Sequence, residues 1–406
     1  MVNKNLAIDF TPAEEEFQKY EVSYSSFLPV KGKLFYDLPD GAYCEKFFLE
    51  AGERKKFTSY IDGYLSGRCA SGLYRVEFQP VGETDAAFSF HGIRTEKAGT
   101  KEELIFLENE RFRIGTDLRW GGGLCCIEDK QNKSGLKNLL NRYDAGRLIQ
   151  QSYYGTMRPP YQCAVYNGSR WSYNPVQGGD QYANKSKIVD YRLSPDSLYI
   201  KCQPMDWAQN KRITPSYMEN TYTLTADCIR VDNRFTDFSG YEHRNSHQEL
   251  PAFYVISYLD YFTFYDGAAP WTGDALTGRG NLNFWGDARY SRDCYFHVAA
   301  GNTETWCAWT AGEKGYGIGL YTPGCEILFA GRYSHNASKD PEDGAANYVA
   351  PLCTLCLESY KPLEYGYLIT TGDVPAIRQT FTKYKDFRDN ASFREFKEQK
   401  DARERE

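Results

Sequence analysis

Three polar clusters interrupt strand-like patterns and carry the residues whose types could do chemistry. The first runs over 141–155 and places Asp144 three residues before Arg147, across a glycine, so that the two could form an ion pair on a turn. Amides and phenols follow directly and suit a hydroxyl-rich ligand, because both groups donate and accept hydrogen bonds. They are Gln150, Gln151, Tyr153 and Tyr154. An Asp–Arg bridge that only orients a loop explains the cluster equally well.

The second cluster, 171–182, combines aromatic rings with short polar side chains. Trp and Tyr rings could stack on a sugar ring, and the polar groups could meet its hydroxyls. The residues concerned are Trp171, Tyr173, Asn174, Gln177 and Asp180. Gly178 and Gly179 would let the backbone approach a ligand closely. A tight turn with Asp180 as its cap is the structural alternative.

The third cluster, 243–252, holds two of the five histidines of the chain. On a strand, His247 and Glu249 would share a face, because side chains alternate. An imidazole and a carboxylate on one face could serve as acid and base or position a water molecule. Two ligands at this spacing are weak evidence for a metal, so no metal site is predicted. A buried His–Glu pair without catalytic use remains the alternative.

Composition and pattern indicate an all-β chain that must position these clusters. Its 406 residues include 33 Tyr, 24 Phe, 7 Trp and 35 Gly, and aromatic residues favour strands whereas Gly marks turns. Five short strands are expected between residues 33 and 90, and longer alternating strands follow from about residue 102. The best helix is expected over 373–387, with an acidic cap and Pro375 in its first turn.

Charge and cysteine usage narrow the classes of protein. The net charge of −6, without a long basic run, predicts neither a nucleic-acid nor a membrane partner. No apolar run approaches the length of a membrane span. Several of the twelve cysteines lie in apolar strand-like runs, and the first residues lack the apolar core of a signal peptide. We therefore expect free thiols and a cytoplasmic location, or a secreted one if a signal has been removed.

Four segments are predicted from the spacing of the elements. Residues 1–25 form an N-terminal extension, and 26–100 form a small accessory β-sandwich. Residues 101–390 form the main β domain, and 391–406 form a charged C-terminal tail. No phosphate-binding glycine loop joins a strand to a helix, so no cofactor is expected, although a structural divalent cation stays open. Nothing in the sequence specifies the oligomeric state.

The motifs together resemble a galactose-mutarotase-like family of bacterial and plant β-supersandwich proteins. The matching segments are 138–155, Asn-Pro-Val-Gln-Gly-Gly-Asp over 174–180 and His-Gln-Glu-Leu-Pro-Ala over 247–252. Trp309, the glycine-rich segment 317–323 and the segment 372–378 fit the same pattern. The resemblance covers roughly 105–385 and implies a large antiparallel β-supersandwich. Its wider superfamily includes epimerases, lyases and glycoside hydrolase domains, so it implies sugar recognition more strongly than one reaction.

Three functions follow as hypotheses. The first is a glycoside hydrolase that uses paired carboxyl groups, Glu249 and a more exposed, ionised Asp180, with His247 tuning Glu249 and Asp144 in reserve. The second is a polysaccharide lyase, in which Arg147 neutralises a uronate carboxylate beside His247 or a Tyr. The third is a sugar-binding protein without catalysis. All three place the clusters on one face around a saccharide.

Overall fold

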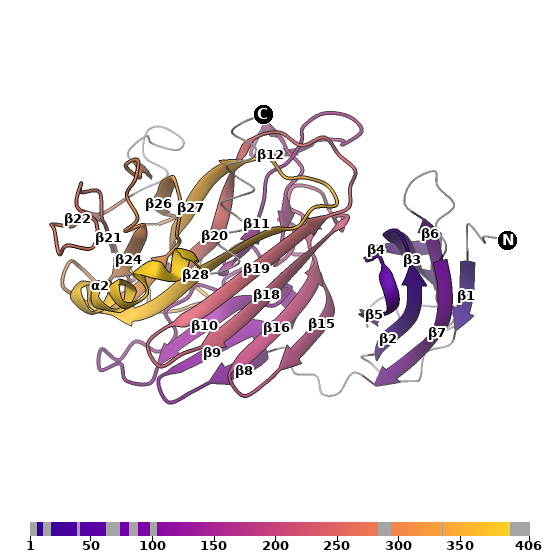
Figure 1. The fold of residues 1–406 in the computed structure, drawn as a ribbon, viewed down its shortest axis with the longest axis horizontal. Coiled ribbons are helices and arrows are strands. Elements are labelled where there is room, and N and C mark those ends of the chain that lie inside the picture. The colour runs from indigo at the N-terminus through magenta and orange to yellow at the C-terminus, as the bar shows by residue number, and fades with distance from the viewer. Residues whose placement is uncertain are drawn as a thin grey trace.

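The computed structural model describes residues 6–10, 18–38, 41–61, 74–80, 88–97, 104–282, 294–334 and 336–389. Antiparallel sheets dominate the described residues, which confirms the predicted all-β class. The expected C-terminal tail and the junction near residue 100 lie outside the described residues. Figure 1 shows a small N-terminal group of strands beside a larger layered body.

The N-terminal strands form two small sheets that face each other. A four-stranded sheet has the order β1-β6-β3-β4, and a three-stranded sheet has the order β5-β2-β7. Tyr20, Val22, Leu49, Phe57 and Val76 pack together between them. The bounds are β1 (Leu6–Phe10), β2 (Gln18–Ser26), β3 (Val30–Leu38), β4 (Gly41–Leu49), β5 (Gly52–Ile61), β6 (Tyr74–Pro80) and β7 (Phe88–Lys97).

The expected N-terminal extension, 1–25, is therefore not separate from the accessory sandwich. Strand β1 pairs with β6 throughout its length, and β2 is the central strand between β5 and β7. The alternation of Tyr20, Val22 and Tyr24 supplies apolar side chains to the shared core. The charged composition of the first residues concealed this strand pattern.

Two large sheets form the main body. The seven-stranded sheet has the order β17-β14-β11-β20-β27-β26-β23, and the nine-stranded sheet has the order β15-β16-β18-β19-β28-β25-β24-β21-β22. Their bounds are β11 (Gln150–Ser152), β14 (Pro175–Val176), β15 (Lys187–Leu193), β16 (Ser197–Gln203), β17 (Met205–Asp206), β18 (Ser216–Leu224), β19 (Ile229–Asp237), β20 (Ser246–Ile256), β21 (Tyr261–Phe264), β22 (Thr277–Gly280), β23 (Tyr295–His297), β24 (Trp306–Thr310), β25 (Gly317–Tyr321), β26 (Ile327–Arg332), β27 (Ala346–Leu355) and β28 (Leu363–Gly372).

The largest apolar cluster joins these two sheets. Phe253 and Val349 from the seven-stranded sheet pack in one cluster with Met218, Val231 and Trp309 from the nine-stranded sheet. Side chains that alternate with them, such as Tyr254 and Tyr348, belong to a separate cluster on the other face of the seven-stranded sheet. We call this the outer face of the seven-stranded sheet.

Smaller elements close the remaining edges. A three-stranded sheet contains β8 (Leu104–Glu108), β9 (Phe112–Asp117) and β10 (Gly123–Asp129), with the short helix η1 (Leu118–Trp120) after β9. Helix α2 (Val374–Lys383) covers the outer face of the nine-stranded sheet through Ile377 and Phe381, and η3 (Lys385–Asp389) follows it. Asp373 caps α2 by accepting from the backbone N–H of Ala376 at 2.9 Å, as the sequence predicted.

The N-terminal sandwich packs on the nine-stranded sheet near β15. Val189, Tyr217 and Phe238 of the main body join the sandwich core. The Lys201 ammonium also lies 3.0 Å from a Glu50 carboxylate oxygen. Figure 1 shows the small sheets beside β15, away from β20, β26 and β27.

Candidate functional site

Glu249 lies on the outer face of the seven-stranded sheet, surrounded by phenols. It is half-buried on β20, where it pairs with Ser152 of β11 and with Leu352 of β27. The Tyr348 hydroxyl donates to Glu249 Oε1 at 2.6 Å, and the Tyr154 hydroxyl donates to the same oxygen at 3.1 Å. Three adjacent strand segments thus hold one carboxyl group between two phenolic donors.

Burial raises the pKa of Glu249 above its ordinary value of 4.5, because a desolvated carboxylate is less stable than the neutral acid. Hydrogen bonds from Tyr348, Ser152 and Tyr154 lower the pKa and oppose part of this effect. Burial and the nearby Glu249 charge hold the pKa values of Tyr154 and Tyr348 well above 10. Both phenols therefore keep their protons near neutral pH, and Glu249 is the most acidic group of the three.

The phenols continue from Glu249 to an arginine. The Tyr254 and Tyr348 ring centroids lie 4.5 Å apart, and the Tyr254 hydroxyl is 3.4 Å from the Tyr333 hydroxyl. The Arg147 guanidinium lies 5.5 Å from the centroid of the Tyr333 ring. We refer to Glu249, Tyr154, Tyr254, Tyr333, Tyr348 and Arg147 as the Glu249 cluster.

The predicted pairing of Asp144 with Arg147 is confirmed. Arg147 Nε lies 3.6 Å from Asp144 Oδ2, and the Asp144 side chain is 40% exposed. Arg147 also donates to the carbonyl of Gly344 and lies over the Tyr143 ring at 4.9 Å. The guanidinium thus joins the partly exposed carboxylate of Asp144 to the aromatic part of the Glu249 cluster.

Gln248 positions Tyr154 through its backbone. The Gln248 Oε1 atom accepts from the Tyr154 N–H at 2.7 Å, and the Gln248 Nε2 atom donates to the Tyr154 carbonyl at 2.8 Å. Gln248 is fully buried, and this bidentate contact fixes the strand segment that carries the Tyr154 phenol. The sequence motif over 247–252 contains Gln248. Its positioning role depends on the contact with the distant segment around Tyr154, which the sequence alone does not show.

On the other side of Tyr154, the second predicted cluster contributes Trp171. The Tyr154 and Trp171 rings meet edge to face with centroids 6.1 Å apart. The indole N–H of Trp171 donates to Asn174 Oδ1 at 2.9 Å, and Asn174 Nδ2 donates to the Tyr153 carbonyl at 2.7 Å. Tyr154 of the first cluster and Trp171 of the second therefore meet beside Glu249.

All four predicted sugar-binding amides and two of the tyrosines are buried, which corrects their assignment. Gln150 bonds the backbone of Ala145 and Gly178, and Gln151 bonds Glu219, Asn220 and Tyr153. Gln177 bonds the backbone of Gly121 and Gln151. None of the six side chains of this group is more than 1% exposed: Gln150, Gln151, Tyr153, Tyr173, Asn174 and Gln177. They organise the protein interior, because buried polar groups require such partners.

Asp180 contradicts the expectation of an exposed carboxylate. It is 1% exposed and accepts hydrogen bonds from the N–H groups of Tyr182, Asn184 and Lys211, at 2.8 to 2.9 Å. The Asn184 side chain donates a fourth bond at 2.7 Å. These donors fold the turn after Gly179 around the carboxylate. The structural alternative for Asp180, a capping residue in a tight turn, is the correct one.

His247 is exposed and is not the partner that tunes Glu249. Its ring Nδ1 lies 3.0 Å from the Thr354 hydroxyl on the neighbouring strand. The two side chains do alternate to one side of β20, but the groups that shift the pKa of Glu249 are Ser152 and the two tyrosines. Tyr254 and Tyr348 were missed because a Tyr in an alternating strand is more often a core residue, and Tyr333 was missed because it directly follows β26 and belongs to no motif.

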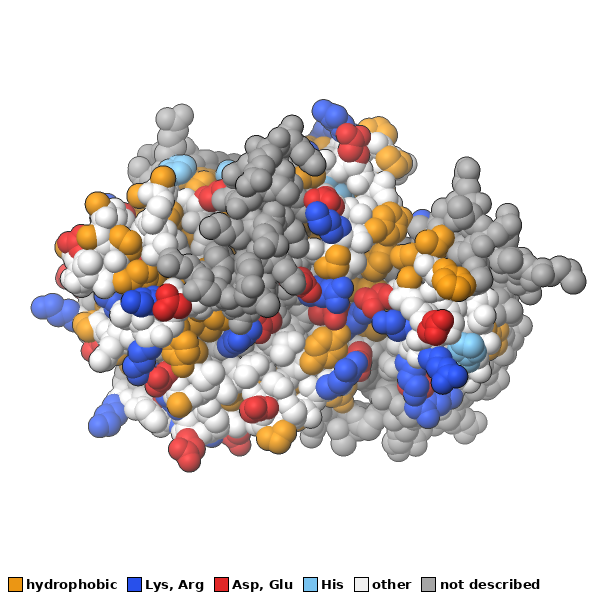
Figure 2. Space-filling model, viewed as in Figure 1, with side chains coloured by type: hydrophobic (Ala, Val, Ile, Leu, Met, Phe, Trp, Pro, Cys, Tyr) orange, Lys and Arg blue, Asp and Glu red, His pale blue; other side chains and the backbone are white. Residues whose placement is uncertain are grey.

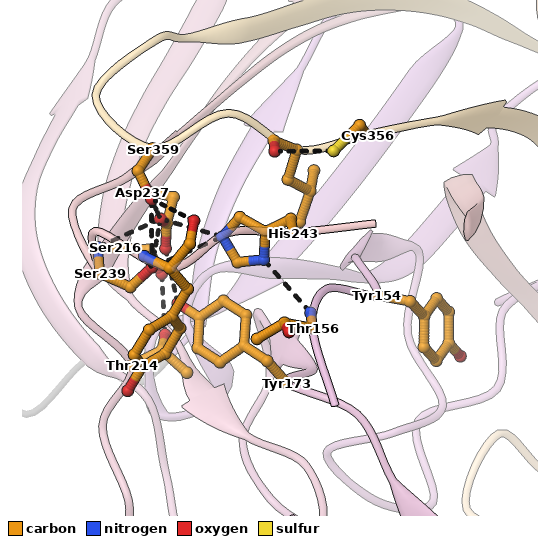
Figure 3. A network of polar contacts seen from close by, with 12 residues as sticks. Tyr154, Thr156, Tyr173, Thr214, Ser216, Asp237, Ser239, His243, Cys356 and Ser359 are labelled. Atoms are coloured by element: carbon orange, nitrogen blue, oxygen red, sulfur yellow. Dashed lines mark hydrogen bonds and ion pairs between the residues drawn. The ribbon is translucent and has the colours of Figure 1, made fainter. Parts of the chain in front are cut away.

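A second polar network surrounds the buried pair of His243 and Asp237 (Figure 3). His243 Nε2 lies 3.2 Å from Asp237 Oδ2, whereas His243 Nδ1 accepts from the backbone N–H of Thr156 at 3.3 Å. Ser239 donates to the same carboxylate oxygen at 2.6 Å, and Ser359 also donates to it. Sequence reasoning did not find this network, whose members come from distant segments.

This network resembles a Ser–His–Asp arrangement in composition but not in connectivity. In such a triad the histidine nitrogen remote from the aspartate takes the proton of the serine. Here that nitrogen accepts from Thr156, and both serine hydroxyls donate to Asp237. The network anchors the segment after Tyr154, whose ring points away from it in Figure 3.

Other expectations can be checked on the described residues alone. All ten cysteines whose side chains are described are free, in agreement with the predicted thiols. The described side chains contain no group of three or more potential metal ligands. Among the described helices, none has the length and apolarity that crossing a membrane requires. Acidic and basic side chains are interspersed over the face that Figure 2 displays.

Comparisons with known proteins find likeness only in solved structures. No protein-family model and no curated protein sequence matches the chain. A galactose mutarotase-like protein from Lactobacillus casei ATCC 334 is 13% identical, with a TM-score of 0.37 over 66% of this chain and 99% of that one. A galactose mutarotase related enzyme from Lactobacillus acidophilus is 9% identical, with a TM-score of 0.41 over 66% and 97%.

A larger protein is also similar. The GH36 alpha-galactosidase AgaB from Geobacillus stearothermophilus is 11% identical, with a TM-score of 0.40 over 70% of this chain and 42% of that one. At these identities the likeness concerns the fold alone.

Proposed function

We propose that the protein binds a saccharide on the outer face of the seven-stranded sheet and transforms it by proton transfer through Glu249. The observation that carries this proposal is a half-buried carboxyl group with a raised pKa, held between the Tyr154 and Tyr348 phenols. A raised pKa makes the Glu249 carboxylate a stronger base than an exposed one and its neutral form easier to populate, as general acid or base catalysis requires. Phenols and indoles beside it suit the polar edges and apolar faces of sugars.

The reaction that these residues support best is β-elimination from a uronate. Glu249 as its carboxylate removes the C5 proton, the C4–O4 bond breaks, and a C4=C5 double bond forms. The leaving oxygen takes a proton from the Tyr348 phenol, which Glu249 then restores. The Arg147 guanidinium neutralises the substrate carboxylate, which makes the C5 proton more acidic.

Arg147 supports this assignment because it is the cation of the cluster. Its planar guanidinium carries five N–H donors, of which the contacts to Asp144 and Gly344 use only a part. A guanidinium can therefore pair with a uronate carboxylate in addition to these contacts. Asp180 does not take part, since four donors already surround its buried carboxylate.

Hydrolysis by paired carboxyl groups is the second candidate, with Asp144 in place of Asp180. It is favoured by one observation, the ion pair that links the partly exposed Asp144 to Arg147 of the same cluster. Protonated Glu249 would then serve as the acid and Asp144 as the base or nucleophile. Inverting enzymes keep such groups roughly 6.5–9.5 Å apart, and retaining enzymes about 5–5.5 Å.

The experiment is an activity screen on uronate-containing and neutral oligosaccharides with two readouts. Elimination produces the ultraviolet absorbance of an unsaturated uronate together with a new reducing end, whereas hydrolysis produces the reducing end alone. Glu249→Gln should abolish the signal that the wild-type protein gives. Glu219→Gln is the matched control, because Glu219 also accepts from a phenol, Tyr199, at 2.6 Å but lies on β18 of the other sheet.

Each outcome decides a different part of the proposal. Absorbance with new reducing ends supports elimination, and new reducing ends without absorbance support hydrolysis. Saccharide binding without any product contradicts the catalytic proposal and identifies a sugar-binding protein. Turnover that survives Glu249→Gln at the wild-type rate contradicts the assignment of Glu249.

A further inference from the structure

We propose that Tyr166, Trp171 and Trp207, here called the aromatic platform, form a second saccharide subsite, so that the ligand is a chain of several sugar units. This inference rests on the proposed function in that the Glu249 cluster holds the unit that reacts. The platform would hold units further along the same chain. A monosaccharide substrate would leave it without a role.

Two of the three platform rings, Tyr166 and Trp171, lie on a short surface hairpin, and Trp207 directly follows β17 (Met205–Asp206). Strands β12 (Ala164–Tyr166) and β13 (Ser169–Trp171) form a separate two-stranded sheet. Tyr166 and Trp171 meet edge to face with centroids 4.9 Å apart, and Tyr166 meets Trp207 in the same way at 5.9 Å. All three rings are partly exposed, and none of their mutual contacts is a parallel stack.

Two contacts make the platform continuous with the Glu249 cluster. Tyr154 donates to Glu249 and also meets Trp171 at 6.1 Å between ring centroids. On the other side, a Cβ atom on Gly146 would lie 2.6 Å from the Trp207 ring. The absence of a side chain at Gly146 therefore lets the turn that carries Arg147 approach the platform closely.

The rings are fixed before any ligand binds. Asn174 Oδ1 accepts from the indole N–H of Trp171 at 2.9 Å, and the Asn174 backbone carbonyl accepts from the backbone N–H of Trp207 at 2.9 Å. The buried Asn174 thus holds the ring of Trp171 and the backbone of the segment that carries Trp207. A prearranged aromatic surface binds with a smaller loss of conformational entropy than mobile side chains do.

The residues around the aromatic platform favour a saccharide as its ligand. The platform leads directly to a carboxyl group poised for proton transfer, and tyrosine and tryptophan combine an apolar ring with a hydrogen-bonding edge. Exposed charged and polar residues, Arg170, Asn167 and Gln162, lie on this hairpin or just before it. A protein partner that instead covered the platform is an outcome of the test.

The test measures binding as a function of chain length. The probes are oligogalacturonides and cello-oligosaccharides of two to eight units, titrated by calorimetry and by quenching of tryptophan fluorescence. We expect the wild-type protein to bind hexamers of one series at least about tenfold more tightly than dimers. Tyr166→Ala should reduce hexamer affinity about tenfold more than dimer affinity, whereas Tyr166→Phe should largely retain it.

The control is Phe27→Ala, which removes a ring that is 76% exposed on the N-terminal sandwich. Equal affinity for dimers and hexamers, or equal losses in Tyr166→Ala for every length, would overturn the subsite. The subsite would also be overturned if a co-purified protein covered the platform and the oligosaccharides bound only after that protein had been removed. The same binding experiment on Glu249→Gln distinguishes the subsite from the proposed catalysis. A variant without turnover should still bind hexamers more tightly than dimers if the subsite exists.

Discussion

At the scale of single residues, the local environment decides which acidic side chain can carry a proton. Glu249 and Asp180 are both within motifs that stand out in the sequence, yet their surroundings are opposite in kind. Glu249 receives phenolic hydrogen bonds on an outward face and titrates with a raised pKa. Asp180 is enclosed by backbone donors that hold a turn. A sequence identifies both candidates but not the donors that separate them.

The hydrogen bond from Tyr348 gives a prediction about pH. Because this bond stabilises the ionised form of Glu249, Tyr348→Phe should raise the pKa of Glu249 further. Tyr348→Phe also removes the proposed acid for the leaving oxygen, so kcat/KM should fall at every pH. If Glu249 is the base, the acidic limb of the remaining activity should in addition move to higher pH by about 1. Tyr199→Phe removes the comparable bond to Glu219 and should leave the profile in place. If the acidic limb of Tyr348→Phe stays at the wild-type pH, that limb does not report the ionisation of Glu249.

The turn around Asp180 gives a prediction about stability. Asp180→Asn places an amide NH₂ among four donors, so we expect a loss of about 1–3 kcal/mol in the free energy of unfolding. Urea denaturation measures this loss. Turnover per folded molecule should stay at the wild-type value. An Asp180→Asn variant with wild-type stability but without turnover would show that Asp180 takes part in catalysis.

At the scale of elements, the sequence predicted the strands from their alternating pattern, but it did not predict which distant strands lie side by side. The five strands expected between residues 33 and 90 coincide with β3 to β7, and the helix expected over 373–387 contains α2. These follow from local pattern and capping. The aromatic surroundings of Glu249 come from β11, β20, β26, β27 and the segments beside them, so their assembly depends on strand order.

The buried amides show why the site was only partly predicted. Gln150, Gln151 and Gln177 carry groups that suit a sugar, but the register of β11 and β14 turns them toward backbone partners inside the protein. A strand of three residues is too short for alternation to reveal which face is buried. Composition therefore identified the right segments, whereas the pairing of strands determines which of their side chains reach the surface.

The edge strand β17 contains a second carboxyl group with an unusual environment. Burial raises the pKa of Asp206 from 3.8 to about 7, despite a hydrogen bond from Tyr161 at 2.9 Å and the nearby Arg212 charge. Its Oδ1 atom is buried without a hydrogen-bond partner among the described residues. Ionisation of Asp206 in the folded state is therefore costly.

The sign of the resulting pH dependence follows from this raised pKa. The neutral acid stabilises the fold fully below pH 3.8, and this contribution disappears as the pH rises through 7. Asp206→Asn removes the titration, so from pH 5 to 8 the wild-type protein should lose on the order of 2 kcal/mol more unfolding free energy than the variant. Chemical denaturation at both pH values measures the difference, and parallel changes would contradict a raised pKa.

At the scale of the whole molecule, the two faces of the sandwich have different neighbours. Helix α2 and the N-terminal sandwich pack on the nine-stranded sheet, through Phe381 and Tyr217 respectively. The Glu249 cluster lies on the outer face of the seven-stranded sheet, on the opposite side of the shared core. This arrangement leaves the N-terminal sandwich beside the nine-stranded sheet and gives it a stabilising role in our account.

The central claim is that Glu249 transfers the proton while other residues bind the saccharide. The most direct measurement compares kcat and the dissociation constant of Glu249→Gln with those of wild-type protein and Glu219→Gln, on the substrate that the screen identifies. We predict that kcat of Glu249→Gln falls by at least about 10²-fold, with the dissociation constant nearly unchanged. Glu219→Gln should match the wild-type protein. A Glu249→Gln variant that binds and turns over at the wild-type rate would contradict the account.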